Sequence, residues 1–187
     1  MRAGREGIAI LKNRLTSAPS NMEASKATLA DVRKLRTFFL QAWRETGPGS
    51  LGFTGATEAT INQIASEEFL KDRLTNPNVN IYTVQDHGSV LGFAATRRID
   101  EDTVELSGII VLDSATGKGI GTQLFEKVLY SAREVGFHKI VVKTEIVNRR
   151  AIAFYKKMGL EEVGKTTENV EGTSVDVVVL EKAIEQV

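Results

Sequence analysis

The chain has 187 residues, of which 42% are hydrophobic, so it is long enough for one domain with a full hydrophobic core. Its 24 basic and 24 acidic residues cancel, which removes the global field that would make nucleic acid or an anionic membrane an obvious partner. The absence of cysteine excludes disulfides, zinc-thiolate sites and a cysteine nucleophile, and two histidines far apart in sequence give no reason to expect a metal.

The first 21 residues are expected to be an extension of the domain. Three apolar residues recur at helical spacing within residues 5–15, which is compatible with a short amphipathic helix or with a flexible segment. A proline with small polar neighbours then indicates a linker, so we expect the domain to cover residues 22–187. No secretory signal pattern is present, and no run approaches the roughly 18 apolar residues of a membrane span, so we expect a cytoplasmic protein.

Two helices are predicted next. Thr28 and Asp31 are typical of a helix start, because the hydroxyl can cap free N–H groups and the acid lies near the positive end. The apolar residues that follow at helical spacing are Val32, Leu35, Phe38, Phe39 and Trp43. A second helix is predicted over residues 58–74. The glycine-rich loop between them, residues 46–56, is predicted to be mobile.

The remaining elements predict a mixed sheet. Residues 79–85 and 90–97 alternate apolar and polar side chains around a short polar turn, which predicts a β-hairpin. The elements predicted after it are a strand over 103–112, a helix from Ile120 to Gly136, a strand over 138–146, a helix over 148–158 and strands over 161–165 and 173–181. A strand–helix–strand crossover beside antiparallel hairpins requires a mixed α/β sheet.

The most informative stretch is the link between the third strand of this series and the helix after it. Gly117, Gly119 and Gly121 let a ligand approach the backbone, and the first N–H groups of a helix carry partial positive charge. This arrangement predicts a phosphate site. A nucleotide-triphosphatase loop would need glycine where Leu112 stands, and a dinucleotide loop would need glycine where Thr122 stands. Taken alone, the glycines are equally compatible with a packing role.

Residues 116–121, which read Thr-Gly-Lys-Gly-Ile-Gly, resemble the pyrophosphate loop of the GNAT superfamily of acetyl-CoA dependent N-acetyltransferases. The family carries Gln or Arg where this chain has Thr116, and proline is common where Asp113 stands. The resemblance implies that backbone N–H groups of this loop cradle the pyrophosphate, and that the preceding strand binds the pantetheine arm in β-sheet fashion. The cofactor-binding residues implied are Ile110, Val111, Leu112, Thr116, Gly117, Lys118, Gly119, Ile120, Gly121 and Thr122.

A second match to the family lies in residues 148–160. Asn148, Ala151, Tyr155 and Gly159 follow the family's pattern of Asn, Ala, Tyr and Gly. By resemblance, Asn148 and Ala151 bind the pantetheine arm, while Tyr155 lies near the acetyl-CoA sulfur and protonates the departing thiolate as general acid. The alternative is that Tyr155 is only an aromatic core residue.

Glu105 is the third candidate. It precedes Thr116 by eleven residues, which is the offset of the catalytic glutamate in the histone-acetylating branch of the family. A carboxylate there could take a proton from an amine, directly or through water. An exposed strand glutamate without a catalytic role is equally compatible.

The resemblance covers roughly residues 24–182 and implies a three-layer α/β fold. Its central sheet is mostly antiparallel, splayed at two parallel strands and flanked by about four helices. The implied reaction moves an acetyl group from acetyl-CoA, without a metal, to a small-molecule or peptide primary amine that attacks directly in a ternary complex. We expect a monomer or homodimer without nucleic-acid or membrane partners, and Glu45 faintly favours a cationic acceptor. The rival interpretation is a non-catalytic acyl-CoA-binding module.

Overall fold

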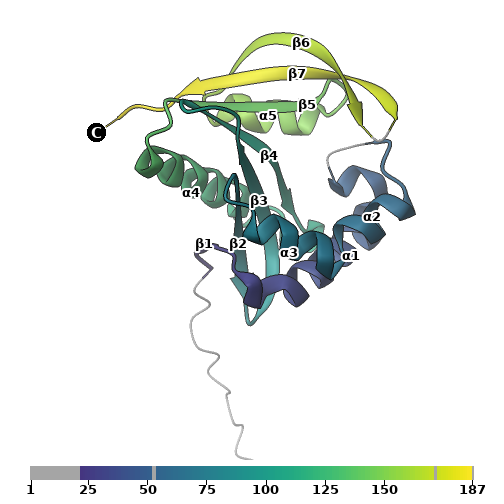
Figure 1. Cartoon of the computed structure of the whole chain (residues 1–187). Helices are drawn as coiled ribbons and strands as arrows, with labels where there is room; N and C mark the ends of the chain where they lie inside the picture. Colours follow the sequence, from purple (N-terminus) through teal and green to yellow (C-terminus); the bar gives the residue numbers. More distant parts are fainter. Residues whose placement is uncertain (1–21, 52–53, 171, 187) are drawn as a thin grey trace, which may run out of the picture.

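The computed structural model describes residues 22–51, 54–170 and 172–186, so the predicted N-terminal extension lies outside the described residues. Seven strands form one sheet in the order β1-β2-β3-β4-β5-β7-β6 (Figure 1). The strands are β1 (Ala24–Lys26), β2 (Val79–Asp86), β3 (Ser89–Arg98), β4 (Thr103–Val111), β5 (Lys139–Glu145), β6 (Glu161–Val170) and β7 (Thr173–Ala183). Only β4 and β5 pair in parallel among the described residues, which confirms the mixed sheet.

Helices cover both faces of the sheet, as the three-layer fold requires. The α-helices of the described residues are α1 (Val32–Thr46), α2 (Glu58–Ile64), α3 (Glu67–Thr75), α4 (Ile120–Val135) and α5 (Arg149–Lys157). Short 3-10 helices cover Leu29–Asp31, Gly47–Leu51 and Asp113–Ala115. In Figure 1, α1, α2 and α3 lie on one side of β2 to β4, and α4 lies on the other. The Phe154 ring of α5 packs edge-on against Phe125 of α4, so α5 belongs to the α4 side.

The prediction of one helix over residues 58–74 is wrong, because the helix is interrupted after Ile64. Ala65 ends α2, and the Ser66 hydroxyl accepts a hydrogen bond from the Phe69 N–H at 3.2 Å, which caps a new helix. A serine that satisfies a free helix N–H favours a helix start over helix continuation. The predicted helix start at Thr28 is confirmed, and there the Thr28 N–H donates to the Asp31 carboxylate at 2.9 Å, which is the acidic half of a capping box.

The other predicted elements occur with shifted ends. The β2–β3 hairpin turns through His87 and Gly88, both at positive φ, and α4 ends at Gly136 in the left-handed conformation. Strand β6 extends to Val170, although residues 161–165 were the expected strand. Because β6 is a polar edge strand with exposed side chains, it lacks the alternation that marks a half-buried strand.

One end of α4 is seated directly on β3. Ile120, the first residue of α4, is fully buried, and a Cβ atom added to Gly92 of β3 would lie 2.4 Å from its Cγ2. Gly92 is the register partner of Val111, the last residue of β4. This close approach fixes the start of α4 beside the end of β4.

Strands β4 and β5 separate partway along their length. Their parallel pairing runs from Thr103 with Lys139 to Leu106 with Val142 and stops there. Strand β4 carries a bulge at Ser107, which has no register partner because Leu106 pairs with Thr96 of β3 and Gly108 pairs with Ala95. A bulge bends its strand, so the second half of β4 leaves β5 and exposes one edge. No helix among the described residues is long and apolar enough to cross a membrane.

Candidate active site

Two cavities meet where β4 and β5 separate. The first, of about 350 Å³, lies along the end of β4, the loop that follows it and the first turn of α4. The second, of about 410 Å³, lies between α1, α3 and the opposite face of β2 to β4. Both volumes are in the range of ligand sites. The residues that line both cavities are Ile109, Ile110, Asn148, Ala151 and Tyr155.

The predicted glycine loop forms one wall of the first cavity. Gly117 and Gly119 have φ values of +83° and +76°, a left-handed conformation that disfavours other residues, and Gly119 is the N-cap of α4. The first turn of α4 contains no acidic residue, so the partial positive charge of the helix start is not neutralised there. The loop residues that line this cavity are Thr116, Gly117, Gly119, Ile120, Gly121 and Thr122.

Two predicted cofactor-binding residues lie outside the lining of either cavity. Lys118 has an exposed side chain, and Leu112 is buried in the core. The Leu112 N–H donates to the Leu91 carbonyl of β3 at 3.0 Å, so it is already used. Successive residues of a strand direct their backbone groups to opposite edges, and therefore Val111 and Ile109 face the open edge of β4.

Tyr155 lies where the cavities meet and is 5% exposed. Burial raises the pKa of its hydroxyl to about 12, and a hydrogen bond with the Ile109 backbone opposes this shift. The phenol is therefore protonated throughout the physiological range. Its ring contacts Phe154 edge-on at 5.4 Å between centroids, so it is both a core residue and a lining residue.

Asn148 begins α5 beside Tyr155. Its side-chain oxygen accepts a hydrogen bond from the Ala151 N–H at 3.1 Å and so caps the helix. The family resemblance implied that Asn148 binds the pantetheine arm. The cap uses one of the two lone pairs of this oxygen, so a ligand can bind the NH2 group and the second lone pair.

Glu105 lines neither cavity. Its carboxylate, 13% exposed, accepts hydrogen bonds from Arg97 Nε at 3.1 Å and from Arg97 Nη2. Ile110 is four register steps further along β4, once the bulge is discounted, which is about 13 Å at the rise of a strand. Glu105 is therefore too far away to exchange a proton directly with a ligand group that lies beside Ile110.

Glu45 holds the loop after β4 in place. Its carboxylate accepts hydrogen bonds from the Asp113 N–H at 2.7 Å and from Ser114 Oγ at 3.1 Å. A hydrogen bond from Gln41 is the largest cause that lowers the pKa of Glu45, and the bonds from Ser114 and Asp113 add to it. The sequence suggested that Glu45 would attract a cationic acceptor, whereas this geometry uses the carboxylate to join α1 to the loop.

Arg150 and Glu145 are two further charged residues at the site. Arg150 lines the first cavity, and its guanidinium lies 3.4 Å from Thr116 Oγ1 and 3.9 Å from an Asp113 carboxylate oxygen. Glu145, at the end of β5, is 5% exposed and accepts hydrogen bonds from the Thr54 N–H at 3.1 Å and hydroxyl at 2.8 Å. It therefore ties the loop before α2 to the splayed end of the sheet.

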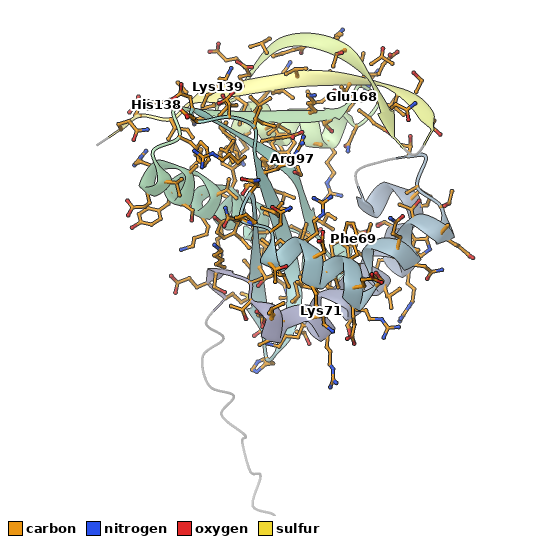
Figure 2. The ribbon with its side chains drawn as sticks, in the orientation of Figure 1. Phe69, Lys71, Arg97, His138, Lys139 and Glu168 are labelled. Atoms are coloured by element: carbon orange, nitrogen blue, oxygen red, sulfur yellow. The ribbon has the colours of Figure 1, made fainter. Side chains whose placement is uncertain are left out.

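The second cavity is apolar with basic residues at its margin. Phe69 of α3 and Arg97 of β3, both labelled in Figure 2, line it from the helical layer and from the sheet. Its charged lining residues are Arg73, Arg97 and Lys143. Among the described residues, no group of three or more His, Asp or Glu side chains could hold a metal ion.

The site therefore combines a helix start that suits phosphate, an open strand edge beside it and a second cavity that meets the first. The chain belongs to the acetyltransferase (GNAT) family, which it matches over residues 38–160. It is 34% identical over 94 residues to an uncharacterized N-acetyltransferase of Mycobacterium tuberculosis. That match covers 50% of this chain and 60% of the mycobacterial protein.

Solved structures show the same fold. The Streptococcus mutans protein smu.2055 superposes with a TM-score of 0.70 at 20% identity. That match covers 88% of this chain and 100% of the Streptococcus protein. The PaiA N-acetyltransferase of Thermoplasma acidophilum, solved in complex with coenzyme A, gives a TM-score of 0.65 at 20% identity. That match covers 86% of this chain and 98% of the Thermoplasma protein.

Proposed function

We propose that the protein is an N-acetyltransferase that moves an acetyl group from acetyl-CoA to a primary amine, which attacks directly in a ternary complex. The observation that carries this proposal is the meeting of the two cavities at Tyr155 and the open edge of β4. A donor in the first cavity and an amine in the second would have their reacting groups side by side.

The first cavity suits acetyl-CoA, which supplies the acetyl group as a thioester. Backbone N–H groups at the start of α4 would hold the pyrophosphate, and Gly117 and Gly119 leave open space in front of them. Arg150 would supply the long basic side chain that Thr116 lacks. Val111 and the Asn148 amide would bind the pantetheine arm, beside Ala151.

Tyr155 is the proposed general acid. The amine nitrogen bonds to the acetyl carbon and releases a proton to water, the carbon–sulfur bond breaks, and the departing sulfur accepts a hydrogen bond from the Tyr155 hydroxyl. Because the pKa of Tyr155 is about 12, and thiols titrate at about 8.5, complete proton transfer is uphill. The hydroxyl therefore acts first as a hydrogen-bond donor to the developing thiolate, and solvent completes the protonation.

Glu105 stays a candidate base, which at this distance would act on the amine through more than one water. Two roles can be separated by the Glu105→Gln variant. If Glu105 removes a proton, kcat falls by about 100-fold or more, whereas a residue that only holds Arg97 changes KM for the acceptor. Retention of kcat would leave proton removal to water.

Calorimetric titration with acetyl-CoA, with ATP as the negative control, tests the donor site. Gly119→Asp should abolish binding because it adds a carboxylate and a strained backbone at the pyrophosphate position. Gly88→Asp is the matched control, because Gly88 also has positive φ, +82°, and open space but lies in the β2–β3 turn. Equal affinity of both variants would contradict the loop assignment.

Thiol release in the presence of primary amines tests turnover. Release that requires both acetyl-CoA and an amine supports the enzyme. Acetyl-CoA binding without turnover on any amine would instead support the non-catalytic acyl-CoA-binding module. The domain limits at 22 and 187, the cytoplasmic location and the monomeric or homodimeric state stay predictions.

A further inference from the structure

We infer that the acceptor is an elongated apolar amine with an anionic group at the end remote from the amine, and that Arg73, with Arg97, binds that anionic group. This inference rests on the proposed function, because it assigns the amine to the second cavity. It departs from the cationic acceptor that the sequence faintly favoured.

The charged side chains that line the second cavity indicate which kind of acceptor it suits. Its charged lining residues, Arg73, Arg97 and Lys143, are all basic. Two of them are compensated, since Arg97 pairs with Glu105 and Lys143 pairs with Glu168. Arg73 lies over the Phe69 ring at 5.1 Å and has no ion-pair partner within the described parts of the chain. The cavity therefore carries a basic surplus that suits an anion and disfavours a polycation.

Arg73 and Arg97 lie at the same end of the second cavity. Arg73 lies in the last turn of α3, which ends at Thr75, just before β2 begins at Val79. Val79 is the register partner of Arg97 and also lines the cavity. Both arginines therefore lie at the end of the cavity where β2 begins. The Glu105 carboxylate on the neighbouring strand holds the Arg97 guanidinium there.

The distance between Arg97 and the reacting end of the cavity sets the length of the acceptor. Phe93 is four residues before Arg97 on β3 and is the register partner of Ile110, one of the residues that line both cavities. Four residues of strand span about 13 Å. An acceptor whose amine lies near Ile110 and Tyr155 must therefore extend by roughly that length to reach Arg97.

The floor between the two ends is apolar and open. Ile81, Ala95 and Gly108 form one row across β2, β3 and β4, between the row of Arg97 and the row of Phe93. A Cβ atom added to Gly108 would have no neighbour within 4 Å. Small residues in this row leave room for an aliphatic or aromatic spacer, whose burial would contribute to binding.

The amine end contains no lining carboxylate. No Asp or Glu is among the residues described as lining the second cavity. A basic environment without a carboxylate favours the neutral form of an amine, which is the form that attacks a thioester. The lining therefore offers the amine no carboxylate that would stabilise its protonated form.

Three probes of equal chain length test the inference: 8-aminooctanoate, octylamine and 1,8-diaminooctane. The result expected is a kcat/KM for 8-aminooctanoate at least about tenfold above that of octylamine, as a charge-assisted bond provides, with the diamine the poorest. Equal values, or preference for the diamine, would overturn the inference. Acetyl-CoA binding in the same samples tests the proposed function separately, because loss of that binding contradicts the donor site and not the acceptor chemistry.

Arg73→Gln is the informative variant, because replacing Arg97 would also release Glu105. It should raise KM for 8-aminooctanoate about tenfold or more and leave KM for octylamine and the affinity for acetyl-CoA unchanged. Lys71→Gln is the matched control, since Lys71 lies on the same helix, pairs with Glu67 and lines neither cavity (Figure 2). A similar change in both variants, or in neither, would rule out Arg73 as the anion-binding residue. If no probe is acetylated, saturation-transfer NMR on the coenzyme-bound protein reports binding, and absence of 8-aminooctanoate binding overturns the inference.

Discussion

Tyr155 has a protonation equilibrium that should appear in the pH dependence of stability. Its folded pKa is raised to about 12 by burial, whereas an unfolded tyrosine titrates at about 10. The contribution of the neutral phenol to the free energy of unfolding is therefore fully present below pH 10. It is lost as the pH rises from 10 to 12. By linkage, this loss is on the order of 2 kcal/mol by pH 12.

The Tyr155→Phe variant lacks this titration. Urea unfolding at pH 9 and pH 12 should show that the free energy of unfolding falls more in the parent protein, by about 2 kcal/mol. Tyr82, whose pKa burial also raises, is present in both proteins and cancels in the difference. Parallel pH dependence of the two proteins would mean that the Tyr155 phenol is not held neutral by burial.

The same variant should also separate chemistry from binding. Tyr155→Phe should lower kcat by about 100-fold or more, as loss of a general acid does, and leave the affinity for acetyl-CoA within a few-fold. Steady-state kinetics and calorimetry measure the two effects. Tyr130→Phe is the control, since Tyr130 is exposed and lines neither cavity. Unchanged turnover would remove Tyr155 from the mechanism.

Individual site residues could be predicted where they fall within one short sequence motif. Gly117, Gly119 and Tyr155 fall within short patterns, and the structure brings them to one cavity. The supporting contacts could not be predicted, because they join distant parts of the chain. Glu45 and Asp113 are 68 residues apart, and Thr54 and Glu145 are 91 residues apart. No local spacing encodes such pairs.

At the level of elements, the contact between α1 and the loop after β4 should control coenzyme affinity. Glu45→Ala would leave the Asp113 N–H and the Ser114 hydroxyl without their acceptor. We expect the affinity for acetyl-CoA to fall several-fold, because the loop must then be ordered by the ligand itself. Calorimetry checks this, with Glu67→Ala on α3 as the control. Equal affinities would show that α1 does not organise the loop.

The close packing of α4 on β3 predicts that a larger residue at Gly92 destabilises the protein. In Gly92→Ala, the new methyl group would overlap Ile120 Cγ2, which is not a flexible chain end. The start of α4 must move, and overpacking of this kind costs about 1–3 kcal/mol. Chemical denaturation should show the loss, together with weaker acetyl-CoA binding.

Gly121→Ala is the comparison for this variant. A Cβ atom there would lie 3.4 Å from Phe154, close to ordinary contact, so we expect a smaller loss of stability. If both variants are equally stable, the packing of α4 against β3 is looser than the structure indicates.

Elements with strong periodicity were predicted correctly, and the failures have physical causes. Helix α4 combines a buried face with a left-handed glycine at its end, and both signals are visible in the sequence. The break between α2 and α3 depends on one serine that caps a helix, although the apolar spacing runs through it. Strand β6 is exposed from Glu161 to Thr167, so hydrophobic patterning could not define its end.

Over the whole molecule, the two cavities open from opposite faces of the sheet and share only the residues at the splay. Donor and acceptor would therefore bind independently and meet without a carrier on the protein. The shared residues, Ile109, Ile110, Asn148, Ala151 and Tyr155, include no Ser, Cys or His. Tyr155 is held protonated, which makes it a poor nucleophile.

This arrangement predicts sequential kinetics. Double-reciprocal plots at several amine concentrations should intersect, because both substrates must be bound before the acetyl group moves. Intact-mass spectrometry after incubation with acetyl-CoA alone should find no acetylated protein. Parallel plots together with an acetylated intermediate would contradict the ternary complex. Since the chain contains no cysteine, a side chain that accepts the acetyl group would then have to be sought among the residues of the first cavity.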